Sequence, residues 1–186
     1  MTAAFTLFDT AIGACAIAWG ERGVVGVQLP EASAGATRAR MLRRFPGACE
    51  ARPTGDVQQA VDGIVALLEG AASNLNSVVL DMTGVPDFHR RVYAVARCIA
   101  PGSTLSYGDI ARQLGDASQA RAVGQALGRN PFPPIVPCHR VLAAGGKAGG
   151  FSASGGVTTK LRLLMIEGAR PGGEPGLFDR PSGGDV

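Results

Sequence analysis

Pro137-Cys138-His139-Arg140-Val141 is the stretch that best guides the interpretation of this chain. A cysteine beside a histidine is a candidate nucleophile with its base, because the thiolate is the reactive form and an imidazole can take the thiol proton directly or through one water. Proline at four positions within 131–137 removes backbone donors and fixes φ, which predicts an ordered loop rather than a helix. A buried structural cysteine is the alternative that the pair alone leaves open.

The composition is that of a globular protein. The chain has 186 residues, of which 46% are hydrophobic and 18% charged, enough for one good-sized domain or two small ones that share an interface. No apolar run is long enough to cross a bilayer, and no basic region precedes an apolar one at the N-terminus. We therefore expect a cytoplasmic protein with reduced thiols, no membrane segment and no signal peptide.

The cysteines do not form a metal-binding pattern. The four are widely separated without a C-x-x-C pair, and the chain has only two histidines. A zinc site needs closer clusters, so we predict no metal. The three cysteines outside the motif are expected to be buried hydrophobic residues, namely Cys15, Cys49 and Cys98.

Positive charge is concentrated in the part of the chain that holds Cys138. Residues 85–170 carry eleven Lys and Arg against four Asp and Glu, a net charge of +7, whereas residues 1–84 and 171–186 are each at −2. Such a segment favours a polyanionic partner such as nucleic acid. A solvated arginine-rich surface is the alternative that charge alone leaves open.

The first half of the chain reads as strands and helices without identifiable chemistry. Gly-bounded apolar runs predict a hairpin or meander, and apolar residues at helical spacing predict two helices, the second capped by Asp56. The strands are expected at 5–9, 14–19, 24–29 and 77–82, and the helices at 33–45 and 57–69. A structural role follows for this half.

A predicted helix-turn-helix follows a domain boundary at residues 84–86. After a helix over 88–99, Ser106 and Asp109 have the capping-box spacing that opens a helix through Leu114. A Gly turn leads to a second helix over 119–128, capped by Ser118. An ordinary pair of packed helices is the alternative reading of this pattern.

The remainder holds short elements and loops. A strand is expected at 141–144, followed by a Gly-rich loop and a polar loop that reaches residue 156. A helix over 157–167 is expected to turn Leu161, Leu164 and Met165 inward. The Pro- and Gly-rich tail from residue 170 is expected to be disordered.

Several of these motifs together resemble one family, the O6-alkylguanine-DNA alkyltransferases, also called methylated-DNA–protein-cysteine methyltransferases. The similarity runs from about residue 85 to residue 169 and rests on Asn130-Pro131, the PCHRV motif, Ser106-Tyr107-Gly108, Arg121-Ala122-Val123-Gly124 and Ile166-Glu167-Gly168. It implies an α+β fold, with a ribonuclease-H-like αβ domain over 1–84 and a mostly helical domain over 85–169 that carries a winged-helix or helix-turn-helix-like motif. Residues 170–186 form a flexible tail in this scheme.

The resemblance also implies a substrate and its chemistry. The partner would be double-stranded DNA containing O6-alkylguanine, bound by a monomer that needs no metal or organic cofactor. Cys138 would attack the alkyl carbon, His139 would take the thiol proton through a water, and Glu167 would hold the histidine. Asn130 would tie the helix-turn-helix to the active-site loop, and Tyr107 would help to turn the nucleotide and would polarise the leaving guanine.

Further residues would contact the DNA and the rotated base. The helix-turn-helix would dock in the minor groove, where small Ala122 and Gly124 let the helix approach the sugars and Arg121 fills the space that the base leaves. Three more residues would contact the base: the carbonyl of Val141 would read its exocyclic amine, Phe151 would stack on it and Ser152 would donate to O6.

Two departures from the family pattern affect the pocket. Phe151 stands where tyrosine is common, and the loop over 152–156 is two residues longer than the short form. The thioether product would be permanent, so the protein would react once. The longer loop leaves one alternative open, a lesion-binding sensor with little or no transfer. The helix-turn-helix leaves another, a transcription regulator, but the small residues on its second helix argue against the reading of base edges.

Overall fold

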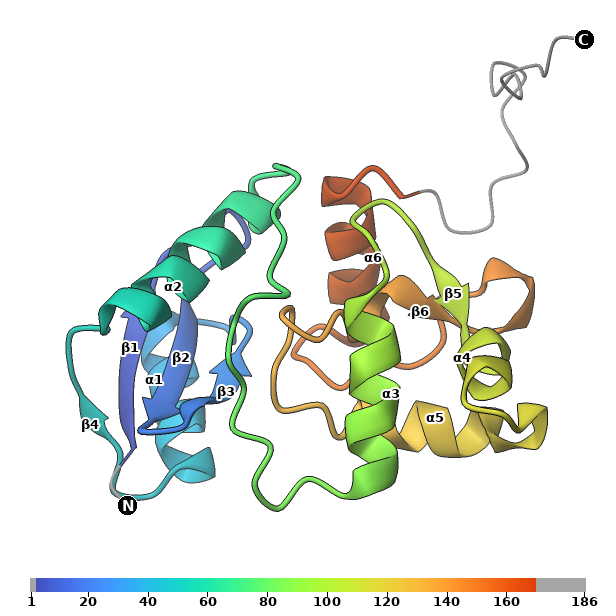
Figure 1. The fold of residues 1–186 in the computed structure, drawn as a ribbon. Coiled ribbons are helices and arrows are strands. Elements are labelled where there is room, and N and C mark those ends of the chain that lie inside the picture. The colour runs from blue at the N-terminus through green and yellow to red at the C-terminus, as the bar shows by residue number, and fades with distance from the viewer. Residues whose placement is uncertain (1–2, 170–186) are drawn as a thin grey trace, which may run out of the picture.

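The computed structural model describes residues 3–169, so the predicted tail lies outside the described residues. Figure 1 shows two units side by side: a sheet with two helices, which we call the sheet unit (residues 3–84), and a mostly helical unit (residues 85–169). The α+β prediction is confirmed. Among the described helices, none is both long and apolar enough to span a membrane.

The sheet unit contains four strands in the order β3-β2-β1-β4. The strands β1 (Ala4–Phe8), β2 (Cys15–Gly20) and β3 (Gly23–Gln28) run antiparallel, close to the predicted ranges. The strand β4 (Cys49–Glu50) pairs parallel with β1 and was not predicted, because two exposed residues carry no alternating pattern.

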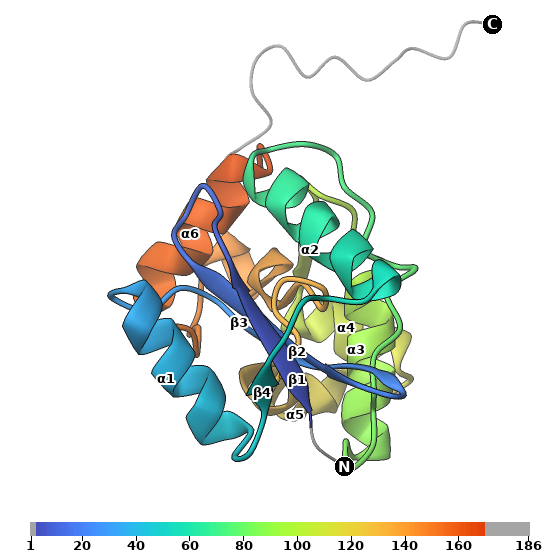
Figure 2. The same cartoon turned by 90° about the vertical axis from the view of Figure 1, so that its left-hand side faces the viewer.

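Alternate residues of β2 face different helices. Ala16 and Ala18 pack with Met41 of α1 (Ala34–Arg44), while Ile17 packs with Ile64 of α2 (Gly55–Leu68). Figure 2 shows these two helices flanking the sheet. The strand is therefore buried on both faces, as its nearly continuous apolar sequence requires.

Two predicted details of the sheet unit are wrong. Asp56 lies inside the first turn of α2, and the N-cap is Thr54, without a side-chain hydrogen bond. The segment 77–82 is not a strand, since only Leu80 forms an isolated bridge, to Val24. Arg97 Nη2 binds the carbonyl oxygens of Leu75, Asn76 and Val78 at the start of this segment, and only Val79 and Asp81 form backbone hydrogen bonds with Val24.

The helical unit begins with α3 (Asp87–Arg97) and continues through the predicted helix-turn-helix. The first helix of that motif, α4 (Tyr107–Gln113), opens with the predicted capping box of Ser106 and Asp109. After Gly115, whose φ of 98° suits a tight turn, the short helix η1 (Ala117–Gln119) leads into α5 (Ala120–Gly128). The predicted cap Ser118 is wrong, because the side chain of Asp116 accepts from the backbone N–H of Ser118.

Short elements surround the PCHRV motif. The parallel strands β5 (Leu105–Ser106) and β6 (Val141–Leu142) pair beside it. The motif forms the short helix η2 (Cys138–Arg140), and the chain then passes through η3 (Ala144–Gly146) into α6 (Gly156–Ile166).

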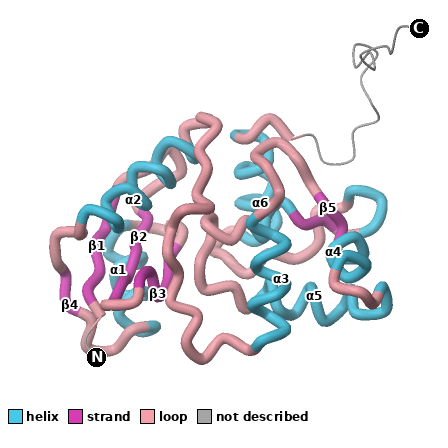
Figure 3. Tube along the Cα trace, in the orientation of Figure 1, coloured by secondary structure: helices cyan, strands magenta, loops and turns pink. Residues whose placement is uncertain are grey.

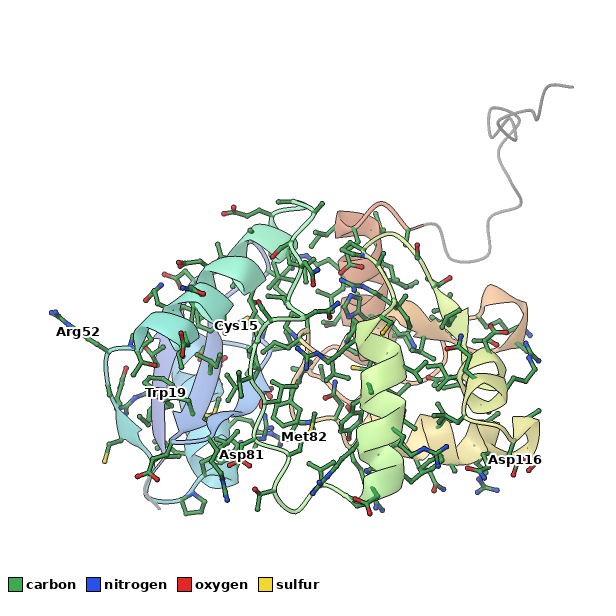
Figure 4. All side chains as sticks on the ribbon, in the orientation of Figure 1. Cys15, Trp19, Arg52, Asp81, Met82 and Asp116 are labelled. Carbon is green, nitrogen blue, oxygen red and sulfur yellow. The ribbon has the colours of Figure 1, made fainter. Side chains whose placement is uncertain are left out.

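The two units share one apolar core. Its buried members include Ile17 and Leu29 of the sheet unit and Val92 and Phe132 of the helical unit. The connecting loop between α2 and α3 runs between the units in Figure 3, and Met82, labelled in Figure 4, lies in that loop and packs on the core. The backbone N–H of Val27 also donates to the carbonyl of Pro131, 2.8 Å away. The sheet unit thus supports the loop that leads to Cys138.

Candidate active site

Asn130 fixes the loop between α5 and Cys138. Its Nδ2 donates to the carbonyl oxygen of Val136 over 2.8 Å, and its Oδ1 accepts from the backbone N–H of Phe132 over 2.9 Å. One amide side chain at the end of α5 therefore spans the proline-rich approach. The predicted bond between Asn130 and backbone near the cysteine is present.

Cys138 starts η2 with its side chain at the surface of a cavity. The residue is only 7% exposed, yet its atoms line a cavity of about 550 Å³. A structural cysteine sealed in the core would line no such opening. The other cysteines differ among themselves: Cys15 is buried as predicted, whereas that prediction is wrong for Cys49, on the two-residue strand β4, and Cys98, at the end of α3, which are both exposed.

His139, Arg140 and Glu167 form a buried network. His139 Nε2 lies 2.8 Å from Glu167 Oε1, and Arg140 contacts both carboxylate oxygens of Glu167 at 2.8 Å through Nε and Nη2. Arg140 Nη1 also donates to the carbonyl of Ile99 over 2.5 Å. Arg140, for which no role was predicted, therefore fixes Glu167, and Glu167 in turn fixes the histidine.

The ionisation of this network follows from burial and pairing. Burial opposes charge on Glu167, but hydrogen bonds from His139 and Arg140 outweigh it and lower the pKa of the carboxyl to about 2. Burial lowers the pKa of His139 despite the bond to Glu167, so its imidazole is neutral at neutral pH. A neutral ring that donates from Nε2 leaves Nδ1 as an acceptor, and Nδ1 is buried without a partner among the described residues.

A buried lysine lies close to Cys138. Lys160 has no exposed surface, and its Nζ donates to the carbonyl oxygen of Val141 over 2.6 Å and lies 5.7 Å from the centre of the Tyr107 ring. Burial raises the pKa of the Cys138 thiol, while the Asn130 side chain and the positive charge of Lys160 act to lower it.

The sequence contained a signal for Lys160 that was misread. The buried face of α6 is Lys160, Leu163 and Leu164, continued by Glu167 at helical spacing. The predicted inward face is wrong for Leu161 and Met165, which are exposed. Placing Glu167 on the inner face would have placed Lys160, seven residues earlier, on the same face.

The cavity brings Cys138 together with the helix-turn-helix. Its lining includes Cys138, five other residues predicted for the site and several neighbours; the five are Tyr107, Arg121, Gly124, Phe151 and Ser152. Ala122 and Val141 do not contribute to the lining. The carbonyl of Val141 already accepts from Lys160 and keeps one lone pair for a second donor. Within residues 3–169, no group of three or more His, Cys, Asp or Glu side chains is arranged to hold a metal ion.

The fold and the site together define a helix-turn-helix protein with a buried Cys-His-Glu constellation at a cavity. Residues 87–169 match the family model described as 6-O-methylguanine DNA methyltransferase, DNA binding domain. A methylated-DNA–protein-cysteine methyltransferase of Methanothermobacter thermautotrophicus is 35% identical over 152 residues, which cover 82% of this chain and 78% of that protein. One from Mycobacterium tuberculosis is 43% identical over 125 residues, covering 67% and 73%. The chain belongs to the O6-methylguanine DNA methyltransferase family.

Solved structures agree with this assignment. The crystal structure of Mycobacterium tuberculosis O6-methylguanine methyltransferase has a TM-score of 0.72 and 33% identity, covering 89% of this chain and 93% of that one. The Mycobacterium tuberculosis protein OGT in complex with DNA has a TM-score of 0.71 and 34% identity, covering 88% and 91%. The similarity therefore includes the sheet unit as well as the helical unit.

Proposed function

We propose that this chain repairs DNA by transferring an alkyl group from O6 of guanine to Sγ of Cys138. The observation that carries the proposal is that Cys138 lines one cavity with Tyr107 and Arg121 of the helix-turn-helix, while the adjacent His139 is held by Glu167. The family relationship, with a related protein solved in complex with DNA, supports double-stranded DNA as the partner.

The lesion reaches the cavity by rotation of the nucleotide out of the duplex. An alkylated O6 lies inside the base stack, so the sulfur cannot reach its carbon until the base is everted. Arg121 is exposed at the start of α5 and takes the place of the base in the stack. A Cβ atom added at Gly124 would lie 3.8 Å from the Tyr107 ring, an ordinary contact, so internal packing does not require glycine there. Its smallness instead serves the approach of the minor groove, together with Ala122.

The buried network activates the thiol. The thiol proton moves through a water to Nδ1 of His139, while Glu167 stabilises the imidazolium that forms. Lys160 favours the thiolate through its positive charge. The sulfur then bonds to the alkyl carbon, the bond between that carbon and O6 breaks, and the electron pair stays on O6.

The remaining residues assist the leaving guanine. Burial raises the pKa of Tyr107, so its hydroxyl stays protonated and can donate to the base as charge develops. Ser152 donates to O6, Phe151 stacks on the ring and the free lone pair of the Val141 carbonyl accepts from the exocyclic amine. No metal or organic cofactor takes part.

The reaction consumes the protein. A thioether has no easily displaced group, so alkylated Cys138 is not regenerated and each molecule acts once. The protein works as a cytoplasmic monomer in this proposal. The longer loop over 152–156 supports the second candidate function, a sensor that binds the lesion and transfers slowly.

The stoichiometry of repair tests the proposal. Increasing amounts of a duplex containing O6-methylguanine are incubated with a fixed amount of protein, and the repaired lesions are counted. We expect a plateau at one repaired lesion per protein molecule, kept by Cys15→Ala and absent in Cys138→Ala. Continued turnover contradicts single use, and tight binding without repair over hours supports the sensor instead.

A further inference from the structure

A second cavity is also lined by Cys138. Its volume is about 380 Å³, and it shares Cys138, Gly128, Phe151 and Ser152 with the lining of the larger cavity. Its other lining residues come from β3 and the segment after it, from α1, from the loop after α5 and from Ala153 and Ser154 of the loop before α6. Cys138 thus stands where two cavities meet, one beside the helix-turn-helix and one beside the sheet unit.

Positive charge predominates in this second cavity. Its lining holds Arg40, Arg44 and Arg129 against a single carboxylate, Glu31. Arg40 and Arg129 are exposed and form no ion pair with any other residue in the range 3–169. The carboxylate of Glu31 accepts instead from the neutral amide of Gln28, over 3.1 Å.

Arg44 is fixed in this lining. Its Nη1 donates to the carbonyl of Val27 over 2.8 Å and to the side chain of Gln28 over 3.2 Å, and its Nη2 donates to the carbonyl of Pro131 over 3.2 Å. Burial lowers the pKa of Arg44, and the nearby charge of Arg40 lowers it further. An anion between the two guanidinium groups would relieve that repulsion.

The geometry of the displacement gives the second cavity a use. Sulfur, the attacked carbon and O6 lie in line in the transition state. In an alkyl group larger than methyl, the rest of the group therefore projects sideways from the attacked carbon and needs space outside the part of the cavity that holds the guanine. We propose that the second cavity receives such groups and prefers those that end in an anionic group, such as carboxymethyl. This inference rests on the proposed function and specifies the class of lesion.

The transfer of a carboxymethyl group follows the same balance as that of a methyl group. Sγ bonds to the methylene carbon, the bond from that carbon to O6 breaks, and the guanine keeps the electron pair: O6 becomes a carbonyl oxygen and N1 takes up one proton from water. The thiol proton goes to His139. The carboxylate is not changed and remains attached to Cys138 through the thioether, facing Arg40 and Arg129.

Paired substrates test the charge preference. Two otherwise identical duplexes carry O6-carboxymethylguanine or its neutral amide, O6-carbamoylmethylguanine, and single-turnover rate constants are measured for each. The ratio of the two constants cancels differences in DNA affinity and folding. In the double variant Arg40→Gln, Arg129→Gln we expect this ratio to fall by about fivefold relative to the wild type, since two partly exposed charges are lost.

Arg38→Gln is the matched control, because Arg38 lies on the same helix but pairs with Glu50 outside the cavity. It should keep the wild-type ratio. An unchanged ratio in the double variant, including the case in which both rates fall equally because the arginines bind a DNA phosphate, overturns the inference. If the wild type does not transfer methyl from O6-methylguanine either, the proposed function itself fails.

Discussion

The two buried cysteines lie in different surroundings, one in each unit. Burial raises the pKa of Cys15 to about 12, and the partner that acts against this is the hydroxyl of Thr10, 3.8 Å from its sulfur. Cys138 is also buried, but the Asn130 side chain and the charge of Lys160 act on it and a histidine follows it. Burial raises the pKa of both thiols, but of the two only Cys138 has a positive charge beside it that favours the thiolate, which is why we propose Cys138 and not Cys15 as the nucleophile.

The same difference applies to the units as a whole. In residues 3–84, no charged side chain is more than partly buried, Arg44 included, whereas His139, Arg140 and Lys160 of the helical unit are each at most 5% exposed. Burying charged groups costs free energy unless each one is paired. The helical unit buries charged groups around Cys138 despite this cost. The sheet unit contributes buried apolar surface and supports the loop that leads to Cys138. Four substitutions test this division, from the largest expected effect to the smallest.

His139→Gln should lower the transfer rate constant by about 10²- to 10⁴-fold, because it removes the group that accepts the thiol proton. The measurement is single-turnover transfer from O6-methylguanine in a duplex. His89→Gln changes the other histidine of the chain, which is outside the cavity, and should keep the wild-type rate. Equal rates in His139→Gln and wild type would rule out His139 as the base.

Glu167→Gln should lower the free energy of unfolding by about 3–5 kcal/mol, since Arg140 then stays buried without a charged partner. Denaturant unfolding at neutral pH measures this loss. The exposed pair of Arg38 and Glu50 gives the control, because Glu50→Gln should cost at most about 1 kcal/mol. A similar loss of unfolding free energy in both variants would show that the buried network stabilises the protein no more than the exposed pair does.

Ile64→Ala should also destabilise the protein, by about 2–5 kcal/mol, because it opens a cavity in the sheet-unit part of the shared apolar core. The transfer rate constant, measured well below the unfolding transition, should remain near the wild-type value. A loss of transfer as large as that in His139→Gln would contradict a purely structural role for this part of the core.

Arg121→Ala should slow transfer from duplex DNA by about tenfold to a hundredfold, because unstacking a base costs a few kcal/mol and the inserted side chain offsets part of it. Transfer from a single-stranded oligonucleotide should fall much less. Arg38→Ala removes the same charge elsewhere and serves as the control. An equal loss on both substrates would assign Arg121 to phosphate binding.

Local patterns allowed much of this structure to be predicted. The strands around Ile17, the helix that contains Ile64 and the capping box of Ser106 and Asp109 each follow from residues close together in sequence. The bond between His139 and Glu167 was expected because the family motif includes both residues.

The missed features depend on contacts between distant segments. Arg97 binds carbonyls at the start of a segment about twenty residues earlier, and the apolar run there forms only one isolated bridge, so it is not a strand. Lys160 was overlooked because Leu161, Leu164 and Met165 offered an apolar face at helical spacing, whereas the spacing to Glu167 selects the face that holds Lys160. The second cavity needs Arg40 and Arg129, about ninety residues apart, and no local pattern indicates that they meet.

The most direct test is the mass of the peptide that contains Cys138 after the protein has been incubated with a duplex that contains O6-methylguanine. We predict that one methyl group replaces one hydrogen on that peptide, that the peptide containing Cys15 keeps its mass, and that the DNA regains unmodified guanine in equal amount. A repaired lesion beside an unmodified Cys138 peptide would contradict the mechanism.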